Sequence, residues 1–146
     1  MTHPSLNRWF AWIDYTKNLE SVSYDIVLHF VSRISKSATI LDFGCGSGWA
    51  TIFVLKNKTQ AFGVGIEISR KLTMEAVRNA EKQGLKSRCD FIVCDCSKLP
   101  FLNSSFDAVI ELNVLHHLSS IQPGLISICR ALKDKGYVLM AESVIN

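Results

Sequence analysis

The chain has 146 residues, of which 48% are hydrophobic and 20% charged, which is enough for one domain that buries its own core. No run approaches the roughly 18 apolar residues of a membrane span, and the start shows no basic-then-apolar export signal. The net charge of +3 is spread along the chain and does not indicate nucleic acid as a partner. We therefore expect a cytoplasmic protein with no membrane partner.

The expected elements begin with a helical segment, in one or two pieces, at residues 9–34. Short apolar runs then predict strands at residues 38–43, 61–68, 90–95, 106–112 and 137–143. Helical patterns predict helices at residues 47–56, 69–84 and 122–132. For the second of these helices, Ser69 is the expected N-cap and Gly84 the stop.

The alternation of strands and helices predicts an α/β fold. We expect a Rossmann-like, doubly wound parallel sheet of five strands with helices on both faces. The strands are apolar almost throughout, as in sheets that are covered on both sides. Residues 38–146 would form this domain, and residues 1–37 the N-terminal helical segment. Ligands bind at the carboxyl ends of such strands, where polar residues follow the apolar runs: Asp42, Glu67, Asp95, Asn113 and Glu142.

Five cysteines are present: Cys45, Cys89, Cys94, Cys96 and Cys129. An odd number without an export signal is typical of reduced thiols. Cys89, Cys94 and Cys96 lack the C-x2-C spacing of a zinc site, and no histidine is near them in the sequence. We expect these three to be small buried hydrophobic residues, and no metal site is predicted.

The stretch LDFGCGSG at residues 41–48 alternates three glycines after an acid, so that the backbone can turn sharply and approach a ligand. The dinucleotide fingerprint G-x-G-x-x-G is not matched, because Trp49 stands where its third glycine lets helix and strand pack closely. Asp42 would disfavour a pyrophosphate but attract an ammonium or sulfonium. No Gly-Lys-Ser/Thr follows, so a Walker loop is excluded as well. The loop favours a ligand that is cationic near the loop and carries a ribose further out.

LDFGCGSG resembles motif I of the class I S-adenosylmethionine-dependent methyltransferases. The resemblance continues through GVGIEIS, DCSKLPFLNSSFDAVIELNVLHHL and LKDKGYVLMAE, from about residue 40 to residue 142. Four motifs in the family's order and spacing are much more specific than one glycine loop. The resemblance implies the family's fold, S-adenosyl-L-methionine as cofactor, and methyl transfer as the activity.

The resemblance also implies a role for each matching residue of the first motif. The methionine part of the cofactor would be surrounded by Asp42, Gly44, Cys45, Gly46 and Gly48. A local role for Asp42, as the cap of a turn, is the alternative.

The later motifs would hold the nucleoside. Glu67 would accept hydrogen bonds from both ribose hydroxyls, and Ile68 would pack on the adenine. Asp95 would accept from the adenine amino group, while the amide of Cys96 binds a ring nitrogen. Asn113 would lie beside the methionine part and face the reacting methyl group. The alternatives are a solvated Glu67 and an Asp95 that only starts a loop.

Methyl transfer is a displacement for which the protein mainly aligns the reactants and excludes water. A general base is required only for a hydroxyl or a protonated amine. His116 is the predicted candidate, with His117 second, and the alternative is a surface pair on a helix. Four aromatic residues could form a lid over the pocket or simply pack in the core: Trp9, Trp12, Tyr15 and Tyr24.

The acceptor is expected to be a small molecule, because the motifs resemble most the group that acts on quinones, lipids and metabolites. A protein or RNA acceptor stays open. The family's sheet usually continues past the fifth strand, whereas this sequence ends at Asn146. An exposed fifth strand predicts a homodimer or a partner chain at the C-terminal strand. The alternatives are a non-catalytic cofactor-binding subunit and, disfavoured by Trp49 and Asp42, a dinucleotide-dependent oxidoreductase.

Overall fold

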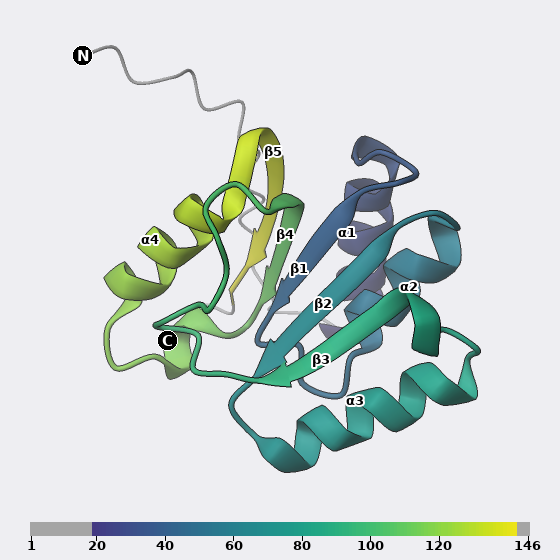
Figure 1. Cartoon of the computed structure of the whole chain (residues 1–146), viewed down its shortest axis with the longest axis horizontal. Coiled ribbons are helices and arrows are strands. Elements are labelled where there is room, and N and C mark those ends of the chain that lie inside the picture. The colour runs from purple at the N-terminus through teal and green to yellow at the C-terminus, as the bar shows by residue number, and fades with distance from the viewer. Residues whose placement is uncertain (1–18, 143–146) are drawn as a thin grey trace.

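The computed structural model describes residues 19–142 and contains a five-stranded parallel sheet in the order β3-β2-β1-β4-β5 (Figure 1). The strands are β1 (Thr39–Phe43), β2 (Phe62–Glu67), β3 (Cys89–Val93), β4 (Phe106–Leu112) and β5 (Leu132–Ala141). The helices are α1 (Leu19–Arg33), α2 (Trp49–Asn57), α3 (Arg70–Lys82) and α4 (Ile121–Ala131), with 3-10 turns η1 (Lys86–Arg88) and η2 (Leu115–His117). The predicted fold class and element order are confirmed.

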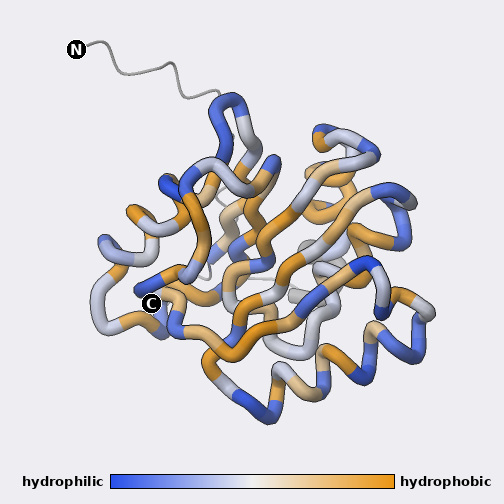
Figure 2. The backbone as a smooth tube through the Cα atoms, viewed as in Figure 1, coloured by the Kyte–Doolittle hydropathy of each residue, from blue (hydrophilic) through white to orange (hydrophobic). Residues whose placement is uncertain are grey.

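The two faces of the sheet are covered by different helices. Successive side chains of a strand point to opposite faces, and Ile40 and Leu41 of β1 are both fully buried. Ile40 packs in a cluster with α1 and α2, whereas Leu41 packs with Ile128 of α4. Helix α3 packs beside α2, where Leu55 and Ala80 share a third cluster. This two-sided burial explains the apolar character of the central strands, in which orange stretches predominate in Figure 2.

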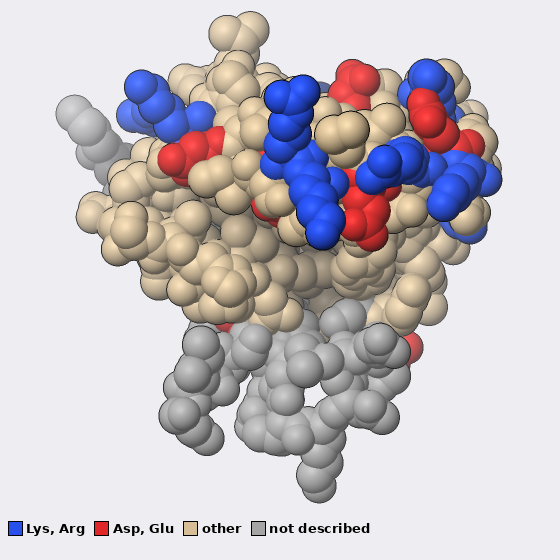
Figure 3. All heavy atoms as spheres, turned by 90° about the horizontal axis from the view of Figure 1, so that it is seen from below, with Lys and Arg blue, Asp and Glu red and all other residues tan. Residues whose placement is uncertain are grey.

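Helix α3 turns its outer side to solvent, on the face seen from below in Figure 1. In Figure 3 this face carries basic and acidic side chains interspersed, without a large patch of one sign. Ser69 caps the helix as predicted, because its Oγ accepts a hydrogen bond from the amide of Leu72 at 3.3 Å. None of the described helices is long and apolar enough to cross a membrane.

Strand β5 corrects the sequence prediction. It begins at Leu132, not at residue 137, because Leu132 already pairs with Phe106 of β4. The pairing then shifts and resumes with Tyr137 opposite Ala108. Lys135 has a positive φ of 61° in the intervening stretch. A pairing partner 26 residues upstream is invisible in the local hydrophobic pattern, which explains the error.

The N-terminal helix is present in the described part of the chain as α1. Trp9, Trp12 and Tyr15 lie outside the described residues. The ring of Tyr24 packs on the rings of Trp49 and Phe53, with centroid distances of 5.2 and 5.4 Å. Tyr24 thus packs on α2 and is not part of the strand-end pocket described below.

The three cysteines expected in the core are buried to different degrees. Cys89 and Cys96 are buried, but Cys94 is only half-buried. Its thiol donates weak hydrogen bonds to the carbonyl oxygens of Asp95 and Lys98. The expectation of burial is therefore confirmed for two of the three.

Arg88 in η1 joins segments from the middle of the fold. Its guanidinium donates hydrogen bonds to the carbonyl oxygens of Leu55 at 3.1 Å, of Lys58 and of Ala61 at 3.0 Å. Helix α2 ends at Asn57, so the Leu55 carbonyl belongs to the last turn, whose carbonyls have no partner within the helix. The side chain thereby fixes the connection from α2 into β2.

Candidate functional site

One pocket of about 430 Å³ lies at the carboxyl ends of the strands. Six of the predicted cofactor residues line it: Gly44, Glu67, Ile68, Asp95, Cys96 and Asn113. The remaining four, Asp42, Cys45, Gly46 and Gly48, are not part of this lining. Sequence reasoning had not singled out the other lining residues, Leu72, Leu112, Val114 and Leu118, because apolar side chains there resemble ordinary core.

Glu67 is held in place by two backbone amides. Oε1 accepts a hydrogen bond from the amide of Ser69 at 2.9 Å, and Oε2 accepts one from the amide of Gly46 at 3.1 Å. Each carboxylate oxygen has two lone pairs, so each retains one for a ligand. The carboxylate is therefore oriented and can still accept two hydroxyl groups that approach from the pocket.

The three glycines of the loop adopt positive φ angles of 72°, 53° and 82° for different reasons. A Cβ on Gly44 would lie 2.4 Å from a methyl carbon of Val114, and one on Gly48 would lie 2.9 Å from Ala76. A Cβ on Gly46 would meet nothing within 4 Å. The first and third glycines are thus required by the packing of the protein itself, whereas Gly46 borders open space.

Asp42 makes a local contact at the start of α2. Its carboxylate is buried and accepts hydrogen bonds from Oγ1 of Thr51 at 2.7 Å and from the amide of Thr51 at 3.1 Å. Burial raises the pKa of Asp42 to about 6, against the opposing effect of both hydrogen bonds. The side chain satisfies an amide in the first turn of α2 that has no partner within the helix.

The two residues after β3 differ in exposure. Asp95 is exposed, and hydrogen bonds from Ser97 lower the pKa of its carboxyl, so that it is an ionised acceptor at the pocket. Cys96 is buried, and this burial raises the pKa of its thiol to about 12. Burial also raises the pKa of the Cys45 thiol. Both thiols are therefore neutral at ordinary pH.

The two histidines after β4 point to different surroundings. His117 lines the pocket, whereas Nδ1 of His116 lies 2.6 Å from Oε2 of Glu142. The two imidazole rings are 4.0 Å apart, centroid to centroid. Asn113 has a positive φ of 58°, and its amide donates to the carbonyl of Ala141, which joins the ends of β4 and β5. This turn directs His117, and not His116, to the pocket.

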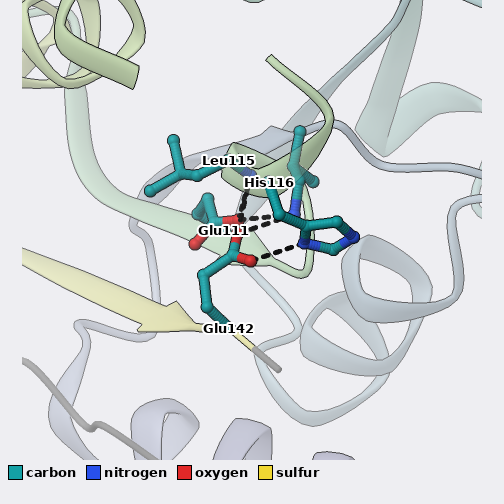
Figure 4. A network of polar contacts seen from close by, with 5 residues as sticks. Glu111, Leu115, His116 and Glu142 are labelled. Carbon is teal, nitrogen blue, oxygen red and sulfur yellow. Dashed lines mark hydrogen bonds and ion pairs between the residues drawn. The ribbon is translucent and has the colours of Figure 1, made fainter. Parts of the chain in front are cut away.

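Glu111 was missed by the sequence reasoning. It is fully buried near the end of β4, and its Oε1 accepts from the amides of Val114 and Leu115, as Glu142 does (Figure 4). An acid inside the apolar run FDAVIEL was the available signal. In an otherwise buried strand, such a residue requires a partner.

The pocket suits a nucleoside with a cationic or polar extension. Its volume is in the range of about 300–1,000 Å³ that is usual for ligand sites. Glu67 and Asp95 supply acceptors for hydroxyl and amino groups, and Ile68 and Leu72 supply an apolar wall for a flat ring. The residues present therefore fit S-adenosyl-L-methionine.

Comparisons with known proteins agree on one family. The family model described as "Methyltransferase domain" matches residues 40–136. "Probable tRNA methyltransferase 9B" of Homo sapiens is 32% identical over 126 residues, which cover 86% of this chain and 24% of that protein. An uncharacterized methyltransferase of Schizosaccharomyces pombe is 32% identical over 120 residues, which cover 79% of this chain and 43% of that protein. The chain thus spans less than half the length of these curated relatives.

Solved structures show the same fold. The cyclase SpnF has a TM-score of 0.73 and 25% identity, over 83% of this chain and 45% of that one. Geranyl diphosphate methyltransferase, in complex with GPP and sinefungin, has a TM-score of 0.75 and 20% identity, over 84% of this chain and 45% of that one. The chain belongs, as its four motifs predicted, to the class I S-adenosylmethionine-dependent methyltransferase family, whose cofactor is S-adenosyl-L-methionine.

Proposed function

We propose that the strand-end pocket binds S-adenosyl-L-methionine and that the protein transfers its methyl group to a small-molecule acceptor. The observation that carries the proposal is the position of two acceptor carboxylates, Glu67 and Asp95, on the same pocket as Gly44 and Asn113.

Glu67 accepts from the ribose hydroxyls with the lone pairs that the amides of Gly46 and Ser69 leave available. Ile68 packs on the adenine, and Asp95 accepts from its amino group. The chain beyond Gly44 approaches the methionine part through its backbone, next to open space at Gly46. These contacts orient the donor, which is the main contribution of a protein to a displacement reaction.

When bound, the cofactor would supply an activated methyl group, which would pass to a lone pair of the acceptor as the carbon–sulfur bond breaks and S-adenosylhomocysteine is left. An acceptor that carries a proton transfers it to a base. The local base is the imidazole pair, in which His117 lines the pocket and the predicted base His116 is fixed by Glu142.

An RNA acceptor is the second candidate, favoured by the 32% identity to a protein named as a tRNA methyltransferase. The interspersed charges of Figure 3 do not favour it over a small molecule. A subunit that binds the donor and requires a partner chain is the further alternative. Because the chain spans only part of its relatives, each acceptor class is tested directly.

The test begins with calorimetric titration of S-adenosyl-L-methionine, of S-adenosylhomocysteine and of NADH. We expect saturable binding of the first two and none of NADH. Donor labelled in its methyl group is then incubated with the protein plus a metabolite extract or plus bulk tRNA. Label in the metabolites supports the proposal, and label only in tRNA replaces its acceptor class. Donor binding without transfer to either leaves the subunit alternative, and absence of donor binding overturns the proposal.

A further inference from the structure

Two glutamates from neighbouring strand ends meet against η2. Oε1 of Glu111 lies 2.8 Å from the amide nitrogen of Val114 and 3.3 Å from that of Leu115. Oε1 of Glu142 lies 2.9 and 2.6 Å from the same two nitrogens (Figure 4). Two carboxyl groups therefore share two N–H donors, and their oxygens are brought close together.

This arrangement disfavours two negative charges. Like charges at such a distance repel each other, and burial removes the water that would screen them. Oε2 of Glu111 is buried and finds no hydrogen-bond partner among the described residues. An ionised Glu111 would leave part of its charge there unpaired, at a considerable desolvation cost. One proton held by the pair removes the second negative charge and so lowers both penalties.

The proton belongs mainly to Glu111. Burial and a side-chain hydrogen bond to Glu142 raise the pKa of Glu111 to about 8. Burial also acts to raise the pKa of Glu142, but hydrogen bonds with Glu111, His116 and the Leu115 amide bring it below its ordinary value. Glu142 is thus the ionised partner, which accepts from Glu111 and from the surrounding donors.

The groups that act on the charge of Glu111 are the carboxyl of Glu142 and the amides of Val114 and Leu115. The partner of Glu111 in register on β1 is the apolar Phe43, and on β5 it is Met140. Helix α4 presents Gly124 to Phe43 at this level of the core. Glu142 from the end of β5, and His116 behind it on η2, are therefore the groups that set the charge of the site.

The segment that these carboxyls hold is also a wall of the pocket. Val114 and Leu115 donate the shared hydrogen bonds, while the pocket is lined by Asn113, Val114, His117 and Leu118 of the same segment. Val114 also contacts the glycine loop at Gly44. Any loosening of η2 therefore changes the wall of the pocket in which the donor is proposed to bind.

We propose that Glu111 and Glu142 share one proton and act as positioning residues for the segment 113–118, and that loss of this proton loosens the segment. Below neutral pH, one neutral and one ionised carboxyl anchor the two amides. In alkaline solution, two carboxylates repel each other and the anchor weakens. The effect on donor binding rests on the function proposed above, but the loosening itself does not.

Hydrogen exchange of the free protein tests the loosening without any ligand. Protection of peptides covering residues 113–118, corrected for the intrinsic rate, is compared between about pH 7 and about pH 9. For a group with a pKa near 8, the wild-type protection falls about tenfold over this interval. In Glu111→Gln, which retains a neutral donor of similar size, the change is less than about twofold. Glu81→Gln, which removes an exposed carboxyl on α3, behaves as the wild type.

Donor affinity, measured by calorimetry at the same pH values, separates this inference from the proposed function. A wild-type loss of affinity that is absent in Glu111→Gln supports the full proposal. The proposal is overturned, whether or not the donor binds, if the protection of residues 113–118 does not change with pH in the wild type. It is also overturned if this protection changes with pH in Glu111→Gln as it does in the wild type. A pH-dependent segment in a protein that binds no donor supports the carboxyl pair and overturns the proposed function instead.

Discussion

Glu67, the last residue of β2, and Asp95, just after β3, border the pocket, whereas Glu111, near the end of β4, and Glu142, just after β5, contact each other and η2. All four occupy the strand ends at which ligands of α/β folds bind. The first two take their hydrogen bonds from separate backbone amides, so lone pairs of both carboxyl groups remain available to a ligand. The last two compete for the same amides. All four acids share the same topological position. The contacts around each acid therefore determine whether it is available to a ligand or holds η2 in place.

The largest effect on stability is expected at Gly44. This residue lines the pocket with Glu67 and Asp95 and contacts Val114 of the segment that Glu111 and Glu142 hold. Gly44→Ala brings a Cβ within 2.4–3.0 Å of Val114, at a φ of 72° that alanine disfavours. We expect a loss of about 3 kcal/mol in the free energy of unfolding, from the strained backbone and from overpacking together.

Gly84→Ala is the matched control, because its φ of 71° is the same within a degree but no atom lies within 4 Å. It should cost only about 1 kcal/mol. Urea unfolding measures both variants. Equal losses of unfolding free energy in the two variants would mean that Val114 moves aside easily, and that the contact between Gly44 and Val114 adds little to stability.

The next effect concerns the binding of S-adenosyl-L-methionine by Glu67. Glu67→Gln replaces one acceptor oxygen by a donor, so it should weaken donor binding by about 2 kcal/mol, or about 30-fold in Kd. S-adenosylhomocysteine should lose the same amount, because both molecules carry the ribose. Calorimetric titration of the two ligands checks this, with Glu81→Gln as a surface control. A loss for only one of the ligands would place Glu67 elsewhere on the donor.

A smaller effect on stability is expected from the hydrogen bond between Thr51 and the buried Asp42. Thr51→Val removes the hydroxyl that donates to Asp42, and should cost about 1 kcal/mol of unfolding free energy at neutral pH. The folded pKa of Asp42, about 6, is above its ordinary value of 3.8, so its ionisation lowers stability as pH rises through this interval. Without the hydroxyl the folded pKa of Asp42 rises further, so the loss of stability in Thr51→Val grows as pH rises above about 6, where the wild-type carboxyl ionises.

Chemical denaturation at several pH values measures this slope. Thr51→Ser retains the hydroxyl and should follow the wild-type pH dependence, apart from a constant loss for the methyl group. A penalty for Thr51→Val that does not change with pH would show that Asp42 stays protonated throughout.

The smallest effect is expected at Asp95, which is exposed to water. Asp95→Asn retains an oxygen that can accept from Ser97, and should reduce donor affinity by less than about 1 kcal/mol. The same calorimetric titration measures it. A loss as large as that of Glu67→Gln would mean that Asp95 and Glu67 contribute equally to donor affinity, although Asp95 is exposed to water.

Element order and most strand bounds follow from the sequence, because a strand covered on both faces is recognisable as an apolar run. The position of Glu67 follows in the same way, since it ends such a run. The direction of a side chain does not follow. His117 reaches the pocket and His116 does not because of the turn at Asn113 and the contact with Glu142, 26 residues further along the chain.

The buried acids show the same limit. Asp42 precedes the glycine loop and is predicted to surround the methionine part of the cofactor, and its hydrogen bonds with Thr51 on α2 could not be read from the sequence. Glu111 has no motif, and its partner Glu142 is supplied by another strand. Such pairs depend on contacts between distant segments, which a hydrophobic pattern does not record. The roles of the predicted cofactor residues stay predictions until a ligand is measured.

The hydrogen bonds of Arg88 bear on how the molecule unfolds. β3 is at the edge of the sheet formed by the described strands, and proteins open locally, in units smaller than the whole fold. Here, detachment of η1 with β3 would separate a guanidinium from carbonyl groups at Leu55, Lys58 and Ala61. The edge that leads to Asp95 is thereby tied to the unfolding of α2 and β2, and its opening should be cooperative with theirs.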